Sequence, residues 1–103
     1  MPVLGTIHHR GRKPGRPYAT PLGIRPAASG FVMPLTFGES AGWYRNIAAA
    51  GWCVVTWRGA DHTVTEPVIV DRATALPAFP RYERLALQAI GINQFVWLRD
   101  APV

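Results

Sequence analysis

The chain has few cysteines and no long apolar run. Its 103 residues include one cysteine, Cys53, so no disulfide can form within the chain. A chain without disulfides fits a reducing compartment. No apolar run approaches the ~20 residues of a membrane-spanning helix, and the residues after Met1 lack the apolar region of a signal peptide. We therefore expect a soluble, cytoplasmic protein without a membrane span.

Acidic residues are also scarce. The chain has 6 Asp and Glu against 11 Lys and Arg, which gives a net charge of +5. The acids show no pairing at a fixed spacing, so they predict no conventional acid–base pair. If the protein is an enzyme, a cofactor is expected to supply the chemistry.

Metal ligation and nucleophilic catalysis have little support. The three histidines, His8, His9 and His62, are scattered, and neighbours on a strand point to opposite faces, so His8 and His9 cannot readily share one ion. Cys53 lies in an apolar stretch and is expected to be buried and inert. We predict no metal site.

The composition predicts one small folded domain over residues 1–103. Hydrophobic residues make up 49% of the chain and charged residues 17%, which suits a packed globule. A chain this short buries only roughly 65% of its unfolded surface. Because Trp52, Trp57 and Trp97 add large apolar surface, we expect a homodimer, with residues 52–57 and 92–98 near or beneath the shared surface.

Alternating apolar residues and turn residues predict six short strands and two short helices. The strands are expected at residues 3–9, 18–24, 31–35, 52–58, 63–71 and 92–99, and the helices at 39–51 and 81–91. Ser40 is the expected N-cap of the first helix, and Gly51 and Gly91 are expected to end the two helices. Residues 25–30 read as a turn and 72–80 as a connection. The expected fold is mainly β (α+β), a small six-stranded β-barrel with helical inserts.

The segment "HHRGRKPGRPYATPL" (residues 8–22) concentrates positive charge. It holds Arg10, Arg12, Lys13 and Arg16, and the first 18 residues contain no acid. Glycines at positions 11 and 15 allow the backbone to approach a phosphate, and guanidinium groups add charge-assisted hydrogen bonds. The segment therefore indicates a local anion site. A solvated cationic loop and a nonspecific nucleic-acid contact are the alternatives.

A second motif is "GWYRN" (residues 42–46) in the first expected helix. Trp43 could pack against an aromatic ligand, and Asn46 could orient that ligand. The alternative is a core tryptophan with a surface asparagine. Tyr82, early in the second helix, points either into a pocket or to the surface.

Together, "GRKPGRPYATPL" (11–22) and "GWYRNIAAAGWCVVTW" (42–57) resemble the deazaflavin-dependent nitroreductase family. The resemblance covers the chain from about residue 4 to residue 98. It implies a split β-barrel of the FMN-binding type that binds reduced coenzyme F-420. It further implies an oxidoreductase that passes a hydride to a small organic acceptor such as a nitro compound, a quinone or an enone.

The resemblance also assigns residues. Those implied at the coenzyme's phosphate and charged tail are Arg10, Gly11, Arg12, Lys13, Gly15 and Arg16. Those implied around the ring are Trp43, Asn46 and the backbone of Met33, Leu35 and Thr36. Tyr82 is the expected acceptor-side residue. The chain departs from the family where "LTFG" (35–38) replaces a Ser-Lys-x-Gly stretch and where Gly23 follows Leu22, both on the substrate side.

Two other functions are compatible with the sequence. The same fold could serve as a non-catalytic cofactor carrier or bind FMN. A nucleic-acid-binding β-barrel is less favoured, because the charge forms one compact loop rather than a stripe and no RNA-binding aromatic motif occurs.

Overall fold

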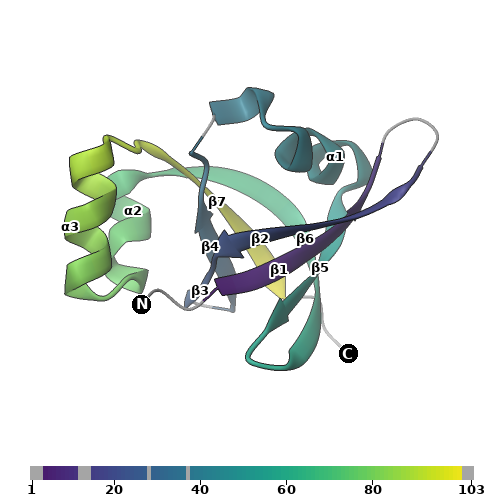
Figure 1. Cartoon of the computed structure of the whole chain (residues 1–103), viewed down its shortest axis with the longest axis horizontal. Helices are drawn as coiled ribbons and strands as arrows, with labels where there is room; N and C mark the ends of the chain where they lie inside the picture. Colours follow the sequence, from purple (N-terminus) through teal and green to yellow (C-terminus); the bar gives the residue numbers. More distant parts are fainter. Residues whose placement is uncertain (1–3, 12–14, 28, 37, 101–103) are drawn as a thin grey trace.

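One antiparallel sheet of seven strands forms most of the molecule (Figure 1). The computed structural model describes residues 4–11, 15–27, 29–36 and 38–100. The strand order across the sheet is β2-β1-β5-β6-β7-β4-β3. The strands are β1 (Leu4–Arg10), β2 (Pro17–Gly23), β3 (Arg25–Ala27), β4 (Gly30–Pro34), β5 (Trp52–Trp57), β6 (Ala60–Asp71) and β7 (Gln94–Asp100).

In the described part of the chain, three α-helices and two short 3-10 helices accompany the sheet. They are η1 (Gly38–Ser40), α1 (Gly42–Ala50), α2 (Arg72–Ala75), η2 (Leu76–Ala78) and α3 (Arg81–Ile90). Figure 1 shows α1 near the β1–β2 hairpin, while α2 and α3 lie together at the other end of the molecule. Within the described part of the chain, none of these helices has the length and apolarity needed to cross a bilayer.

The sheet curls because its two edges are neighbours in the chain. β2 and β3 stand at opposite ends of the strand order, yet Ile24 alone separates them in sequence. The sheet must therefore bend until both edges reach Ile24, whose side chain is fully buried. Gly5 permits this approach, since a Cβ there would lie 2.7 Å from Cδ1 of Ile24. The result is a half-barrel, mainly β, with three helices.

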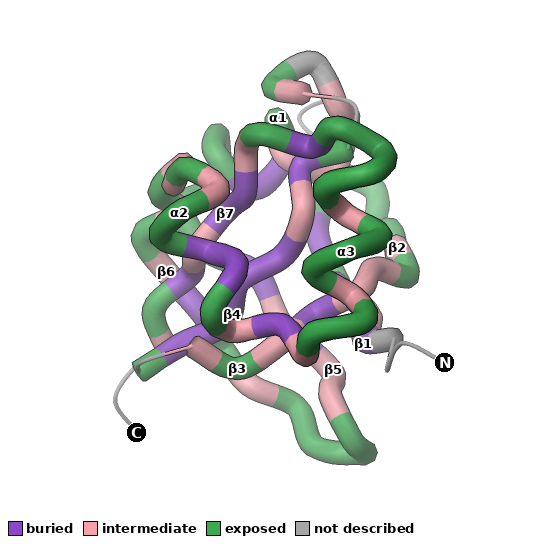
Figure 2. The backbone as a smooth tube through the Cα atoms, turned by 90° about the vertical axis from the view of Figure 1, so that its left-hand side faces the viewer, coloured by how far each residue is buried: buried purple, intermediate pink, exposed green. Residues whose placement is uncertain are grey.

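Two apolar clusters lie on opposite faces of β4 and β7. Figure 2 shows buried positions on both of these strands. Side chains alternate across a strand, so successive residues feed different clusters. Met33 and Leu98 belong to the cluster inside the half-barrel, which α1 closes with the fully buried Ile47. Val32 and Phe95 belong to the outer cluster, which also includes the residues Ala75, Leu76 and Phe79 from α2, η2 and the segment after them. Fully burying a side chain of this size contributes about 1.5–3 kcal/mol.

The sequence places most elements correctly, but six strands and two helices are too few. Residues 25–27 form a strand rather than a turn because they pair with β4, with Arg25 opposite Val32. Residues 72–78 are helical because the carboxylate of Asp71 accepts a hydrogen bond from the Thr74 backbone N–H at 2.8 Å and caps α2. Pro77 stands early in η2, where its missing N–H costs no hydrogen bond.

The predicted helix boundaries are partly confirmed. Gly51 and Gly91 end α1 and α3 with left-handed backbone. The predicted N-cap at Ser40 is wrong, because residues 38–40 form η1 and Ala41 caps α1 without a side-chain hydrogen bond. The turn before β6 is also shorter than expected. Arg58 and Gly59 alone connect β5 to β6, both at positive φ, as in the tight hairpin turns that match strand twist.

The predicted homodimer surface falls on interior strands. β5 lies between β1 and β6, and β7 lies between β6 and β4. Phe95, Val96 and Leu98 are fully buried inside one chain, whereas Trp52 is 46% exposed. The homodimer remains a prediction.

Candidate functional site at the basic hairpin

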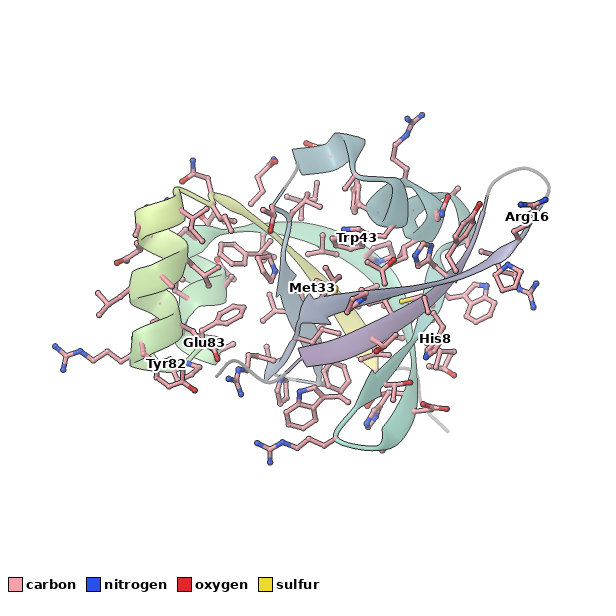
Figure 3. The ribbon with its side chains drawn as sticks, in the orientation of Figure 1. His8, Arg16, Met33, Trp43, Tyr82 and Glu83 are labelled. Carbon is pink, nitrogen blue, oxygen red and sulfur yellow. The ribbon has the colours of Figure 1, made fainter. Side chains whose placement is uncertain are left out.

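The β1–β2 hairpin carries exposed cations at its tip. Arg10 ends β1, Arg16 precedes β2, and both are exposed; Figure 3 shows Arg16 far out at one end of the molecule. Within the described ranges neither arginine forms an ion pair, whereas Arg25 and Arg99 do. The predicted phosphate residues Arg12 and Lys13 lie outside the described residues. The tip thus presents guanidinium charge that no described carboxylate neutralises.

The hairpin backbone uses part of its own hydrogen-bonding capacity. The Gly11 N–H donates to the Arg16 carbonyl oxygen at 2.8 Å, so it is not available to an anion. Gly15 adopts a positive φ of 83°, and a Cβ there would meet only the Gly11 oxygen, at 4.0 Å. Apart from this oxygen, no described residue crowds Gly15. At this tip an anion would be held mainly by the arginine side chains.

A pocket of about 240 Å³ adjoins the hairpin. Two exposed aromatic side chains contribute to it: Tyr18 from β2, 48% exposed, and Trp52 from the start of β5. The Tyr18 ring stacks on His9, with ring centroids 5.7 Å apart. The lining residues are His8, His9, Arg10, Pro17, Tyr18, Ala50, Trp52, Cys53 and Val54. The pocket offers aromatic faces directly beside positive charge.

A buried polar network fixes α1 to this pocket. The Asn46 side-chain amide donates to Nδ1 of His9 at 3.0 Å, and Nε2 of His9 pairs with the Thr20 hydroxyl at 2.8 Å. His9 is 8% exposed and Asn46 9% exposed. Burial lowers the pKa of His9, and the neighbouring His8 lowers that pKa further. His9 is therefore neutral at pH 7, with Nδ1 free to accept from Asn46.

The two neighbouring histidines point to opposite faces, as the sequence predicts. His8 is exposed and lies 3.0 Å from the Thr56 hydroxyl, while His9 faces the buried network. The surface position considered for Asn46 is wrong, since its side chain is buried. Its predicted place at the coenzyme ring remains a prediction. The observed bond to His9 lets Asn46 position the pocket wall.

The other ring-side candidates lie along α1 and the end of β4. Trp43 is partly buried, packs against the inner cluster and meets Tyr44 edge to face, with centroids 6.3 Å apart. The side chains of Met33 and Leu35 are buried, and Thr36 alone of the three is exposed. If this stretch flanks a ring, Met33 and Leu35 would contribute backbone and Thr36 its hydroxyl.

Tyr82 is not brought to this site. It is exposed near the start of α3, and Figure 3 shows it at the opposite end of the chain from Arg16. It lines a separate cavity. Within one chain, Tyr82 and the basic hairpin cannot form one compact site, and the acceptor role of Tyr82 remains a prediction.

Tyr18 and Trp52 are the site residues that the sequence analysis missed. Both are aromatic residues at strand ends, one directly after the basic loop and one directly after a helix-ending glycine. An aromatic residue at a strand end beside a cationic turn is a signal of a binding site, because such a residue contributes little to the core. Nothing in the sequence alone shows that the two strand ends meet.

The described residues offer neither an exposed thiol nor a cluster of metal ligands. Cys53 is buried, as predicted, and burial raises the pKa of its thiol to about 12. Over the described residues no three His, Cys, Asp or Glu side chains gather closely enough to hold a metal ion.

Comparison with known proteins gives a fold relationship. No protein-family model matches the sequence, and no curated protein matches it. Among solved structures, the chain is similar to one described as an F420 reductase. The two share 15% sequence identity with a TM-score of 0.63, over 98% of this chain and 88% of that one. The likeness shows a shared fold across nearly the whole molecule.

Proposed function

We propose that this chain binds reduced coenzyme F-420 and passes its hydride to a small organic acceptor. The observation that carries the proposal is the pair of unneutralised arginines, Arg10 and Arg16, beside a pocket with two exposed aromatic side chains. The shared fold with a protein named F420 reductase supports it. The motif resemblance at residues 11–22 and 42–57 supports it independently of that structure.

The hairpin fits the charged part of this coenzyme. A phosphodiester and a polyglutamate tail carry several negative charges, and guanidinium groups bind such oxygens with charge-assisted hydrogen bonds. No described residue crowds Gly15, so nothing in the described part of the hairpin blocks the approach of a bulky tail there. The tail would be held by Arg10 and Arg16, with Arg12 and Lys13 of the same segment.

The pocket fits only part of the coenzyme. Its volume of about 240 Å³ is below the roughly 300–1,000 Å³ of sites that enclose a ligand. A planar ring held there or against Trp43 would keep one face open, which an acceptor needs. When bound, the reduced deazaflavin supplies the hydride. The protein's part is to hold the ring, shield it with aromatic side chains and leave that face accessible.

Two positions for the ring follow from these observations. The resemblance places the ring at Trp43, near the start of α1, while the pocket places it at Trp52, beyond the end of α1. Binding should quench or shift tryptophan emission. The variants Trp43→Phe and Trp52→Phe separate the two positions, because the variant that removes most of the change identifies the tryptophan at the ring.

The decisive test of the proposal is a binding titration with purified coenzyme F-420. Arg10→Ala/Arg16→Ala should weaken binding by ~2–4 kcal/mol, at ~1–2 kcal/mol for each charge-assisted contact. Arg45→Ala is the matched control, because Arg45 is an exposed arginine on α1 that does not line the pocket. Equal affinity of the double variant and the control would contradict the assignment of the tail site.

Turnover is tested separately from binding. Reduced coenzyme is mixed with nitro compounds, quinones and enones, and its consumption is followed by absorbance. A non-catalytic carrier is the second candidate, favoured because Thr36 is the one polar side chain among the ring-side residues Met33, Leu35 and Thr36. Binding without consumption of the reduced form would select the carrier. Tighter binding of FMN than of the deazaflavin would select the flavin alternative.

A further inference from the structure

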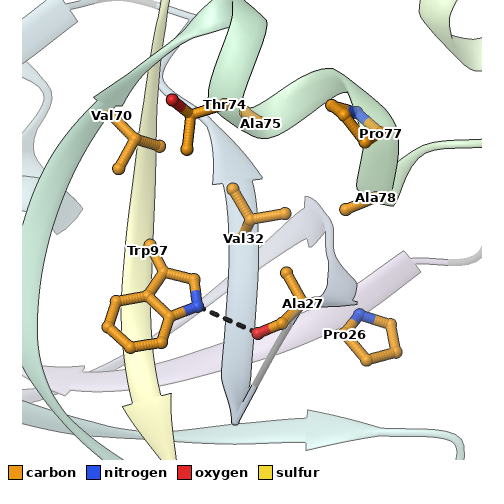
Figure 4. Close-up of a pocket in the computed structure, with 9 residues that line it drawn as sticks. All are labelled: Pro26, Ala27, Val32, Val70, Thr74, Ala75, Pro77, Ala78 and Trp97. Carbon is orange, nitrogen blue, oxygen red and sulfur yellow. Dashed lines mark hydrogen bonds between the residues drawn. The ribbon is translucent and has the colours of Figure 1, made fainter.

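A sizeable cavity lies at the other end of the molecule from the basic hairpin. It measures about 620 Å³ and opens between α2, η2 and the outer face of β3, β4 and β7 (Figure 4). Its lining contains no charged side chain: Pro26, Ala27, Val32, Val70, Thr74, Ala75, Pro77, Ala78 and Trp97. Nε1 of Trp97 donates to the Ala27 carbonyl oxygen at 2.9 Å, so the indole presents its apolar surface. This chamber suits an uncharged, apolar body.

A second cavity of about 540 Å³ continues from the chamber. The two share the lining residues Pro26, Pro77 and Ala78. The walls of the second cavity add Arg25, Trp57, Arg58, Phe79, Pro80 and Tyr82. An apolar chamber therefore opens into a rim with cationic and aromatic side chains.

The rim has one uncompensated positive charge. Arg25 donates two hydrogen bonds to the Glu83 carboxylate, and the two side chains are only 12% and 11% exposed, so this pair is neutral overall. Arg58 is exposed and, among the described residues, forms no ion pair. Its guanidinium lies over the Trp57 ring, 4.7 Å from the ring centroid. The ring thus holds Arg58 at the mouth of the cavity.

Trp57 contributes an unused hydrogen-bond donor. Its Nε1 is enclosed and has no acceptor among the described residues. A buried donor without a partner costs about 1–3 kcal/mol. Because Nε1 is enclosed, the charged group that an incoming oxygen meets at the rim is the Arg58 guanidinium.

We propose that the two connected cavities bind a small amphipathic monoanion, an aromatic or alicyclic carboxylate. Its apolar body would lie in the chamber against Val32 and Trp97, and its carboxylate would lie at Arg58. Three features favour this class of ligand: the size of the two cavities, the absence of charged side chains in the chamber lining and the single net positive charge at the rim. The site does not depend on the coenzyme proposal, because it lies at the opposite end of the molecule.

The test uses 2-naphthoate as the probe and uncharged 2-naphthamide as its match. Both are titrated into the full chain by calorimetry and by two-dimensional NMR of the backbone and indole N–H groups. We expect 2-naphthoate to bind at least about tenfold more tightly than the amide, because its charge meets Arg58. The Trp57 indole N–H signal should shift when the carboxylate binds Arg58, because that guanidinium lies over the Trp57 ring. Equal affinities, or no binding of either probe, would overturn the proposal.

Variants locate the binding. Arg58→Asn should weaken 2-naphthoate about tenfold and leave 2-naphthamide unchanged, and asparagine tolerates the positive φ of 51° at this position. Arg45→Ala, on α1, should change neither affinity. Ala78→Trp should block both probes by filling the junction of the cavities. If this variant unfolds, Arg58→Asn still decides, since unchanged 2-naphthoate affinity would refute the carboxylate site.

Competition separates this site from the coenzyme site. Coenzyme F-420 at a concentration that saturates the hairpin should leave 2-naphthoate affinity unchanged. Displacement of 2-naphthoate by the coenzyme would show that both occupy one site and would overturn a separate carboxylate site. Failure of coenzyme binding alone would refute the proposed function and leave this site intact.

Discussion

Replacing Asn46 by alanine tests whether the buried polar network fixes α1 on the sheet. The change removes the amide that donates to Nδ1 of His9 at 3.0 Å and leaves a buried acceptor without that partner. An unsatisfied buried polar group costs about 1–3 kcal/mol. For a domain of this size, each kcal/mol lowers Tm by roughly 4–8 °C. We expect Asn46→Ala to fold, with its free energy of unfolding lowered by about 1–3 kcal/mol and its Tm lowered by roughly 4–8 °C for each kcal/mol lost.

A double-mutant cycle separates the hydrogen bond from general packing. Asn46→Ala, His9→Ala and the double variant are compared by chemical denaturation. If the two side chains interact directly, the double variant loses less than the sum of the single variants, with a coupling of roughly 0.5–3 kcal/mol. Thr20→Val probes the other bond of His9, at 2.8 Å. Single losses that add within about 0.3–0.5 kcal/mol would refute the reasoning, because the network would then contribute nothing beyond its separate parts.

Four further outcomes are expected. Stability should fall as pH drops below 6.5, the ordinary pKa of histidine, because burial lowers the folded-state pKa of His9 and the unfolded chain then binds the extra proton. His9→Gln, measured by thermal melts at several pH values, should flatten this dependence. An unchanged slope of stability against pH in His9→Gln would contradict the prediction. Gly30→Ala should destabilise the fold by ~1–3 kcal/mol, because its Cβ would lie 1.9 Å from the Leu98 carbonyl oxygen. Gly23→Ala, where nothing lies within 4 Å, is the control. Equal denaturation midpoints of the two variants would show that β4 and β7 can separate at Gly30. Cys53 in the folded protein should resist iodoacetamide at pH 8, since burial raises the pKa of its thiol to about 12. Mass spectrometry should find Cys53 labelled only after unfolding. Rapid labelling of the folded protein would contradict this and would mean that β5 detaches from the sheet. Light scattering at micromolar concentration should give a homodimer, and a single species near 11.3 kDa would reject it.

The elements that follow from local sequence signals were predictable. Glycines at the helix ends, alternating apolar residues and proline-rich turns placed all but one strand and two of the three α-helices close to their observed positions. β3 was missed because a three-residue strand containing Pro26 has no periodicity, and only its pairing with β4 makes it a strand. α2 was missed because its four residues are too few to show a helical period, although Asp71 followed by Thr74 was a capping signal.

The site was predictable where it is continuous in sequence. The basic segment was read directly as an anion site, and two of its arginines are exposed as that reading requires. The contacts of Tyr18, Trp52 and Asn46 depend on β1, β5 and α1 meeting in space. The link between His9 and Asn46 spans 37 residues, and no local pattern encodes such a contact. The cavities between η2 and β3 arise in the same way.

The link through Ile24 also bears on how the protein avoids aggregation. Edge strands offer unpaired backbone groups to other chains, and natural sheets protect them with proline or by covering them. Here β2 contains Pro17 and Pro21, and β3 contains Pro26, so each edge strand has fewer backbone donors to offer. Because the two edges are joined by the buried Ile24, neither can peel away without moving the other. The join at Ile24 therefore restrains both edge strands at the same place, and one buried residue limits the exposure of both.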